Sequence, residues 1–135
     1  MLMPKKTKYR KTQRGVVRGI AKAGRTLSFG THGMVAQSLG FITSRQIDAA
    51  RVCINRELKR EGKLWIRIFP HKPMTKRAAE SRMGQGKGEV DYYAAIVQPG
   101  RIMFEIAGVS DEIAKSAFKK SAYKLPVQVR VIVKK

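Results

Sequence analysis

Apolar residues recur at helical spacing in a segment near the middle of the chain. Four of them fall on one stripe of a helix: Ile47, Ala50, Ile54 and Leu58. The segment starts with a capping box, in which the Thr43 hydroxyl accepts from the amide of Gln46 and the Gln46 side chain reaches back to the amide of Thr43. We therefore predict a helix from residue 44 to about residue 60, ended by Gly62 just beyond it.

A second helix is predicted after Ser110, whose hydroxyl suits an N-cap. Asp111 and Glu112 follow it and complement the positive end of the helix dipole. Apolar residues are again spaced to face inward: Ile113, Ala114, Ala117 and Phe118. Pro126 stops this helix, because proline has no amide to donate.

Short apolar runs predict strands in the rest of the chain. They cover residues 27–29, 34–39, 63–69, 91–97, 101–107 and 127–133. Turn residues at 30–33 separate the first two runs, and Pro70 and Pro73 end the third. Pro99 with Gly100 suits a type II turn between the fourth and the fifth. Trp65 in the third run belongs either to the core, which we favour, or to an edge on which a base stacks.

The order of the elements indicates an α+β fold, because helices and strands mix without strict alternation. The chain has 135 residues, which suits one compact domain with a tail, its two helices packed on a mixed or antiparallel sheet. We assign residues 1–25 to a basic N-terminal arm, which should be largely disordered in isolation because its charges repel. Residues 26–135 form the domain, with a long basic loop at 70–90 of a kind that is usually functional or disordered.

The net charge of the chain indicates that its partner is a polyanion. The chain holds 29 Lys and Arg against 9 Asp and Glu, a net charge of +20. Self-repulsion on such a surface opposes folding, and solubility needs a net charge of only about 2–8. No apolar run approaches the roughly 18–20 residues of a membrane span, and no apolar stretch typical of a secretory signal follows the basic N-terminus. We therefore expect RNA, and no membrane, as the partner.

The glycine-rich segment 82–88 carries the sharpest local signal. It consists of Arg82, Met83, Gly84, Gln85, Gly86, Lys87 and Gly88. Alternate glycines let the backbone approach a ligand closely, and successive amides can bind an anion. The spacing of a P-loop is absent, and the glycines open no helix as a dinucleotide site would require. A flexible linker is the alternative, but the flanking basic residues favour contact with phosphate.

Signals of catalysis or metal binding are few. His32 and His71 stand alone, without the ligand spacing of a zinc site, and the acidic residues are scattered. Cys53, the only cysteine, has no nucleophile motif around it and suits a buried or half-buried position. We expect no metal, no cofactor and no enzyme. The alternative is an RNA-modifying or processing enzyme that holds phosphate with the glycine-rich segment.

The candidate RNA contacts are basic residues in three groups. The arm contributes Lys5, Lys6, Lys8, Arg10, Lys11, Arg14, Arg18, Lys22 and Arg25. The cationic face of the first helix contributes Arg45, Arg56, Lys59 and Arg60. The long loop contributes Lys72, Lys76 and Arg77, together with residues 82–88. A cationic helix face is usually only solvated, but Arg56 and Arg60 lie four residues apart and repel each other, which favours an external anion.

Five segments in the right order resemble one protein family. They are residues 3–10, 43–51, 65–70, 82–88 and 96–100. Together they are similar to the bacterial L-sixteen family of large-subunit ribosomal proteins, whose archaeal and eukaryotic relatives are the L-ten-e proteins. The resemblance covers nearly the whole chain. Gln85 and Phe41 depart from it, since both replace residues that are commonly basic.

This resemblance implies a fold and a function that composition does not show. It implies an α+β fold of the hammerhead type in a ribosome-bound protein that forms no homo-oligomer. The implied location is the cytoplasm, with an organellar ribosome as the alternative. The implied partners are large-subunit ribosomal RNA, A-site and P-site tRNA near the peptidyl-transferase centre, and neighbouring ribosomal proteins. It also implies a role late in subunit assembly. In some members the arginine of the glycine-rich segment is hydroxylated, which corresponds to Arg82.

Overall fold

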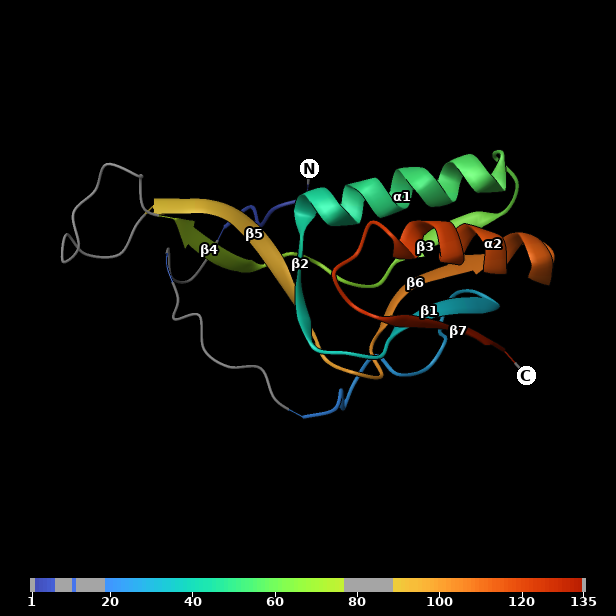
Figure 1. Cartoon of the computed structure of the whole chain (residues 1–135), viewed down its shortest axis with the longest axis horizontal. Coiled ribbons are helices and arrows are strands. Elements are labelled where there is room, and N and C mark those ends of the chain that lie inside the picture. Colours follow the sequence, from blue (N-terminus) through green and yellow to red (C-terminus); the bar gives the residue numbers. More distant parts are fainter. Residues whose placement is uncertain (1, 7–10, 12–18, 77–88, 135) are drawn as a thin grey trace.

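The computed structural model describes residues 2–6, 11, 19–76 and 89–134, and Figure 1 shows its arrangement. In chain order, the elements within these ranges are β1 (His32–Ala36), β2 (Gly40–Thr43), α1 (Ser44–Leu58), β3 (Lys63–Ile66), β4 (Lys72–Lys76), β5 (Glu89–Val97), β6 (Ile102–Ala107), α2 (Asp111–Ala122) and β7 (Val129–Val133). Helices and strands mix without strict alternation, so the predicted α+β class is confirmed.

The strands form two antiparallel sheets in place of one. The first has the strand order β3-β6-β1-β7 and the second the order β2-β5-β4. A turn over residues 98–101 leads from β5 in one sheet to β6 in the other. Gly100 has a φ of 93°, and the Arg101 amide donates to the Gln98 carbonyl at 3.2 Å. This is the geometry of the predicted type II turn, but the turn joins two sheets instead of closing a hairpin within one.

The two helices lie side by side over one face of the four-stranded sheet (Figure 1). The predicted stripe of α1 is buried, with Ile47, Ala50 and Ile54 at 0% exposure. It meets Phe104 of β6 and Phe118 of α2 in one hydrophobic cluster. Burying a side chain of the size of Ile or Phe stabilises a fold by about 1.5–3 kcal/mol, so this cluster is the main source of stability.

Both predicted helix starts are confirmed. The Gln46 amide donates to Thr43 Oγ1 at 3.1 Å, and the Thr43 amide donates to Gln46 Oε1 at 2.9 Å, which completes the capping box of α1. The Ser110 Oγ accepts from the Ile113 amide at 3.4 Å at the start of α2. These caps are local interactions, so residue identity alone was enough to predict them.

Both helices end earlier than predicted. Helix α1 ends at Leu58, because Lys59 and Arg60 turn left-handed, with φ of 52° and 66°. Gly62 also has a positive φ, of 72°. Close packing requires a glycine at this position, because an added Cβ would be 2.4 Å from the carbonyl oxygen of Ala107. Helix α2 ends at Ala122, before Pro126 is reached.

The prediction of a strand at residues 27–29 followed by a turn at 30–33 is wrong. Strand β1 begins at His32 and ends at Ala36, and the separate strand β2 follows it. Residues 27–29 lie outside any strand because the amides of residues 28–30 donate to the side chain of Glu105 instead of to a neighbouring strand. Extended backbone without a ladder partner is not a strand.

The predicted strand 63–69 and the predicted loop 70–90 also differ from the structure. Strand β3 ends at Ile66, and β4 occupies part of the predicted loop, pairing with β5. Strand β4 is the edge of its sheet, where Pro73 needs no ladder partner on its outer side. The expectation of a long irregular loop is therefore wrong for residues 72–76 and for residues 89 and 90, which begin β5, while residues 77–88 lie outside the described ranges.

Residues 19–25, which we assigned to the arm, bond to the domain. The Ala21 amide donates to the Pro99 carbonyl at 2.9 Å, and the Gly24 carbonyl accepts from the Ile102 amide at 2.8 Å. Leu2 is half-buried and packs against the hydrophobic core. The division of the chain at residue 25 stays a prediction.

Candidate nucleic-acid interface

The four-stranded sheet turns one face to the helices and the other to a covering segment of residues 24–31. Phe104 and Ile106 of β6 face the core, so Glu105 between them points to the outer face. Leu27 lies over Gly33 of β1, where an added Cβ would be only 2.6 Å from Leu27 Cδ2. The covering segment therefore seats directly on the sheet.

Glu105 anchors the covering segment. Its side chain is fully buried, and Oε1 accepts from the amides of residues 28, 29 and 30, each at 3.0 Å. Oε2 accepts from the Arg67 guanidinium. Burial raises the pKa of Glu105, but the Gly30 amide, then Arg67 and the other two amides, lower it by more, so the pKa lies below its ordinary value of 4.5. The carboxylate is thus held charged inside the fold.

Above this anchor lie two aromatic rings with a cation near each of them, and we call Phe29, Trp65, Lys63 and Arg67 the aromatic patch. The two ring centroids are 6.0 Å apart with 20° between the ring planes. Lys63 Nζ lies 5.3 Å from the Trp65 ring, and the Arg67 guanidinium carbon lies 5.3 Å from the Phe29 ring. Lys63, Trp65 and Arg67 alternate along the chain, so they share the outer face. Trp65 is half-buried on this face and does not belong to the hydrophobic cluster, so our preference for a core position is wrong.

The C-terminal end of α1 carries a second basic surface, which we call the cationic end of α1. Its cations line one shallow hollow on the helix: Arg51, Arg56, Lys59 and Arg60. Arg51 also forms an ion pair with Asp48 at 3.7 Å. Arg56, Lys59 and Arg60 are exposed. The left-handed turn at Lys59 and Arg60 gathers these three predicted contacts on one surface.

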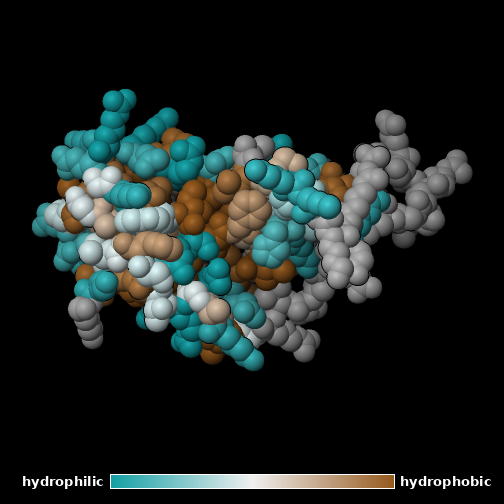
Figure 2. Space-filling model, turned by 180° about the vertical axis from the view of Figure 1, so that it is seen from behind, coloured by the Kyte–Doolittle hydropathy of each residue, from teal (hydrophilic) through white to brown (hydrophobic). Residues whose placement is uncertain are grey.

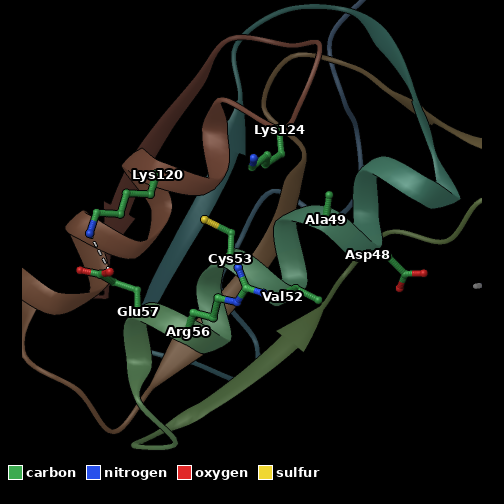
Figure 3. A pocket seen from close by; sticks show the side chains of 8 residues that line it. All are labelled: Asp48, Ala49, Val52, Cys53, Arg56, Glu57, Lys120 and Lys124. Carbon is green, nitrogen blue, oxygen red and sulfur yellow. Dashed lines mark hydrogen bonds and ion pairs between the residues drawn. The ribbon is translucent and has the colours of Figure 1, made fainter.

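A neighbouring hollow lies between α1 and α2, and Figure 3 shows the side chains around it. Glu57 ties the two helices together there, since its carboxylate accepts from Lys120 Nζ and from Ser116 Oγ, both at 2.8 Å. The hydrogen bond from Lys120, and then that from Ser116, lower the pKa of Glu57 below its ordinary value. Cys53 points into the same hollow and is half-buried, as predicted (Figure 3). Lys120 is thereby matched by a carboxylate, whereas Arg56 and Lys124, which line the same hollow, are exposed to solvent.

The structure places the other described candidates apart from one another. Arg45 is exposed at the opposite end of α1, roughly 16 Å along the helix axis from Arg56. Lys72 lies in β4 with its Nζ 5.2 Å from the Phe41 ring, and Lys76 is the last residue of that strand. Four basic candidates of the arm are described and exposed, and none of them belongs to a helix or strand: Lys5, Lys6, Lys22 and Arg25.

Lys11 is the remaining basic candidate in the described part of the arm, and it is half-buried. The remaining candidates lie outside the described ranges: Lys8, Arg10, Arg14, Arg18, Arg77 and residues 82–88. Sequence reasoning missed Phe29, Lys63 and Arg67 as surface residues. The two-residue alternation of 63, 65 and 67 was a usable signal for the last two, but nothing local pointed to Phe29.

One face of the molecule shows apolar and hydrophilic side chains together. Seen from behind, brown apolar atoms reach the surface between hydrophilic ones (Figure 2). The large apolar residues with the highest exposure in the described ranges include Ile20, Phe29 and Tyr123, at 63%, 58% and 81%. The partner that covers such a surface must therefore offer both negative charge and apolar or aromatic contact.

Among residues 2–6, 11, 19–76 and 89–134, no group of three His, Cys, Asp or Glu side chains is placed to hold a metal ion. His32 is buried, with Nε2 2.5 Å from Asp111 Oδ1 and Nδ1 2.8 Å from Thr31 Oγ1, which ties β1 to the start of α2. Within the described ranges, neither helix combines the length and the apolar character that crossing a bilayer requires.

Fold and surface together define the class of the protein: a compact, strongly basic α+β domain whose surface suits a polyanion. The family model described as ribosomal protein L16p/L10e matches residues 4–132, nearly the whole chain. The chain therefore belongs to the L16p/L10e family of ribosomal proteins and is a structural protein of the large ribosomal subunit. This confirms the resemblance found in the sequence.

Proposed function

We propose that the chain binds large-subunit ribosomal RNA through the cationic end of α1, the basic arm and the glycine-rich segment. On this proposal it also contacts A-site and P-site tRNA near the peptidyl-transferase centre and supports late assembly of the subunit. Membership of the family supports ribosomal RNA and neighbouring ribosomal proteins as partners. The residue-level contacts are supported by the charges and positions described above.

The cationic end of α1 carries this proposal. Arg56, Lys59 and Arg60 are exposed and line one hollow. A helix C-terminus attracts cations through its dipole, but that effect is worth only about 0.3–1 kcal/mol at the surface. A left-handed conformation costs a non-glycine residue roughly 1–2 kcal/mol, and two consecutive residues adopt it here. Strain of this kind is typical of functional sites, where the position of a side chain matters more than local stability.

The salt dependence of RNA binding tests the proposal. In one variant, Arg56→Gln, Lys59→Gln and Arg60→Gln remove three charges from the cationic end of α1. Each phosphate contact contributes about 0.7–0.9 to the slope of log affinity against log salt concentration, so the slope for large-subunit RNA should fall by about 2. The measurement is a binding titration at several salt concentrations.

A matched variant controls for net charge alone. Lys115→Gln, Arg130→Gln and Lys134→Gln also remove three exposed cations, from α2, from β7 and from the chain beyond it. This control should keep nearly the full slope. Equal slopes for the two variants would show that the cationic end of α1 makes no specific phosphate contacts.

The glycine-rich segment needs a separate experiment, because it lies outside the described ranges. Arg82→Ala combined with Gly84→Ala and Gly86→Ala removes a permanently charged fork and adds Cβ atoms where close backbone approach is expected. We expect slower maturation of the large subunit or weaker A-site tRNA binding. Normal subunit profiles and normal tRNA binding would show that the segment is only a linker.

A further inference from the structure

The aromatic patch is an exposed surface that the cationic end of α1 does not explain. Phe29 is 58% exposed although it is a large apolar side chain. Its ring is stacked on Trp65 at a centroid distance of 6.0 Å, within the usual 4.5–7 Å range of an offset aromatic pair. Lys63, beside Trp65, is exposed as well. An exposed aromatic stack beside a cation suits a partner that has a flat ring to stack on the aromatic side chains and a negative charge to pair with the cation.

The position of Phe29 is fixed from below. The Phe29 amide donates to Glu105 Oε1 at 3.0 Å, and the amides on both sides of it donate to the same oxygen. Arg67 closes the anchor, since it donates to Glu105 Oε2 and lies 5.3 Å from the Phe29 ring. Because a buried carboxylate holds the backbone of Phe29, the ring is presented to solvent in one orientation. A pre-ordered ring loses little conformational freedom when it binds.

We propose that the aromatic patch stacks on an unpaired base of large-subunit ribosomal RNA, with Lys63 next to the phosphate of that nucleotide. This inference rests on the proposed function and names a second kind of contact for it. Sequence-specific and single-stranded RNA contacts are made mainly by stacking of splayed-out bases on aromatic side chains. Arg67 is held by Glu105, so it supports the ring and leaves Lys63 as the cation for phosphate.

The chemistry of the patch favours RNA over a neighbouring protein. A protein partner would cover apolar area without a requirement for a ring face, and an exposed Lys63 at the edge would oppose burial in an apolar interface. A nucleotide supplies both complementary parts, a flat π-face for Phe29 and Trp65 and a negative charge for Lys63. The two partners differ in one measurable way: stacking needs an aromatic ring, whereas apolar packing needs only volume.

Tryptophan fluorescence gives a direct readout, because Trp65 is the only tryptophan in the chain. The full-length chain is titrated with large-subunit ribosomal RNA, and with a short single-stranded RNA as a simpler probe. A base stacked on the patch should quench the emission of Trp65. Unchanged emission at saturation, with binding verified by sedimentation, would overturn the inference.

Substitutions of Phe29 separate stacking from apolar packing. Phe29→Leu keeps an apolar side chain of similar volume without a π-face, and Phe29→Tyr keeps the ring. Neither changes the amide that donates to Glu105, so both chains should fold. The urea midpoint of Phe29→Tyr should match that of the original chain, and that of Phe29→Leu should fall only by the small contribution of the ring pair with Trp65. We expect Phe29→Leu to weaken RNA binding about 5- to 100-fold, the range of one lost stacking contact, with an unchanged salt slope, and Phe29→Tyr to bind normally.

The outcomes distinguish this inference from the proposed function. If Phe29→Leu binds RNA as tightly as Phe29→Tyr while the α1 charge variant loses salt slope, the aromatic patch does not stack on RNA and the proposed function stands. If Phe29→Leu binds normally and also joins the subunit normally, a neighbouring protein or solvent covers the patch, and the inference is wrong. If the unaltered chain binds large-subunit RNA with no salt dependence, the proposed binding through the cationic surfaces is wrong, and the result for Phe29→Leu alone decides the inference.

Discussion

The cationic end of α1 and the aromatic patch form in opposite ways. Arg56, Lys59 and Arg60 belong to one helix and the turn that ends it, so neighbouring positions in the chain bring them together. Phe29 and Trp65 come from the covering segment and from β3, and they meet only because Glu105 of β6 holds the covering segment on the sheet. The first surface is a product of local structure and the second of tertiary structure.

This difference separates two kinds of recognition. Attraction between exposed charges acts over about 10 Å at 0.1 M salt, so the cationic end of α1 tolerates small errors of position. Stacking requires ring contact, so the aromatic patch depends on an anchor that does not move. Changes to the anchor should therefore affect mainly stability and leave the salt slope unchanged, whereas removal of charge from the cationic end of α1 should lower the salt slope.

Removal of the anchor should have the largest effect. Glu105→Ala leaves three amides and the Arg67 guanidinium without their acceptor. Breaking a buried charge pair by removing one partner costs about 3–5 kcal/mol, so urea denaturation should show a loss of that order. Glu61→Ala removes an exposed carboxylate, and as a control it should stay within about 0.5 kcal/mol. Equal midpoints for the two variants would refute the anchor.

Crowding of the covering segment should have the next largest effect. An added Cβ at Gly30 would lie 2.6 Å from the backbone carbonyl oxygen of Ile106, which cannot move without disturbing β6. Overpacking typically costs about 1–3 kcal/mol, so Gly30→Ala should lower the free energy of unfolding by this amount. Gly33→Ala meets only the flexible end of Leu27 at 2.6 Å and should cost less. The reverse order would show that the covering segment is not seated against β6.

Acidification should weaken the anchor but not the charge of α1. The pKa of Glu105 lies below 4.5 in the fold, so its charged form stabilises the folded state. This stabilisation is fully present above the unfolded pKa and is lost as the pH falls through the folded pKa. Glu57 shifts in the same direction and adds to the loss. Urea midpoints between pH 6 and pH 3 should fall less steeply for Glu105→Gln, and parallel curves would contradict the assignment.

Release of the left-handed turn should give the smallest effect and one of opposite sign. Lys59 has a φ of 52°, which glycine adopts without a Cβ penalty. Lys59→Gly should therefore stabilise the fold by up to about 1 kcal/mol, while it weakens RNA binding through the lost charge. Lys115→Gly makes the same substitution inside α2, where glycine should destabilise by about 1 kcal/mol. Thermal unfolding of the two variants checks the sign, and a loss of stability in both would show that Lys59 is not strained.

The helices could be predicted because their signals are local. The capping box needs only Thr43 and Gln46, three residues apart, and both are in place. The buried stripe of α1 follows from the spacing of Ile47, Ala50 and Ile54. The α+β class followed from the order of such segments. The end of α1 was missed, because the left-handed turn at Lys59 and Arg60 contains no glycine from which it could be predicted.

The covering segment could not be predicted, because its partners are distant in the chain. Residues 27–29 are apolar enough to suggest a strand. The amides of residues 28–30 nevertheless donate to the carboxylate of Glu105, which lies 75 to 77 residues further along the chain. Strand β4 was missed for a similar reason. Lys72–Lys76 contains a proline and becomes a strand only through its pairing with β5.

The sequence by itself determined the net charge of +20, the two capped helices, the fold class and the family, because these depend on composition and on residues close together in the chain. Only the tertiary structure decided that Phe29 stacks on Trp65 and that Glu105 is buried beneath them. The physical reason is that a buried carboxylate requires several donors at once, and only the folded chain brings the amides of the covering segment and Arg67 to the same point.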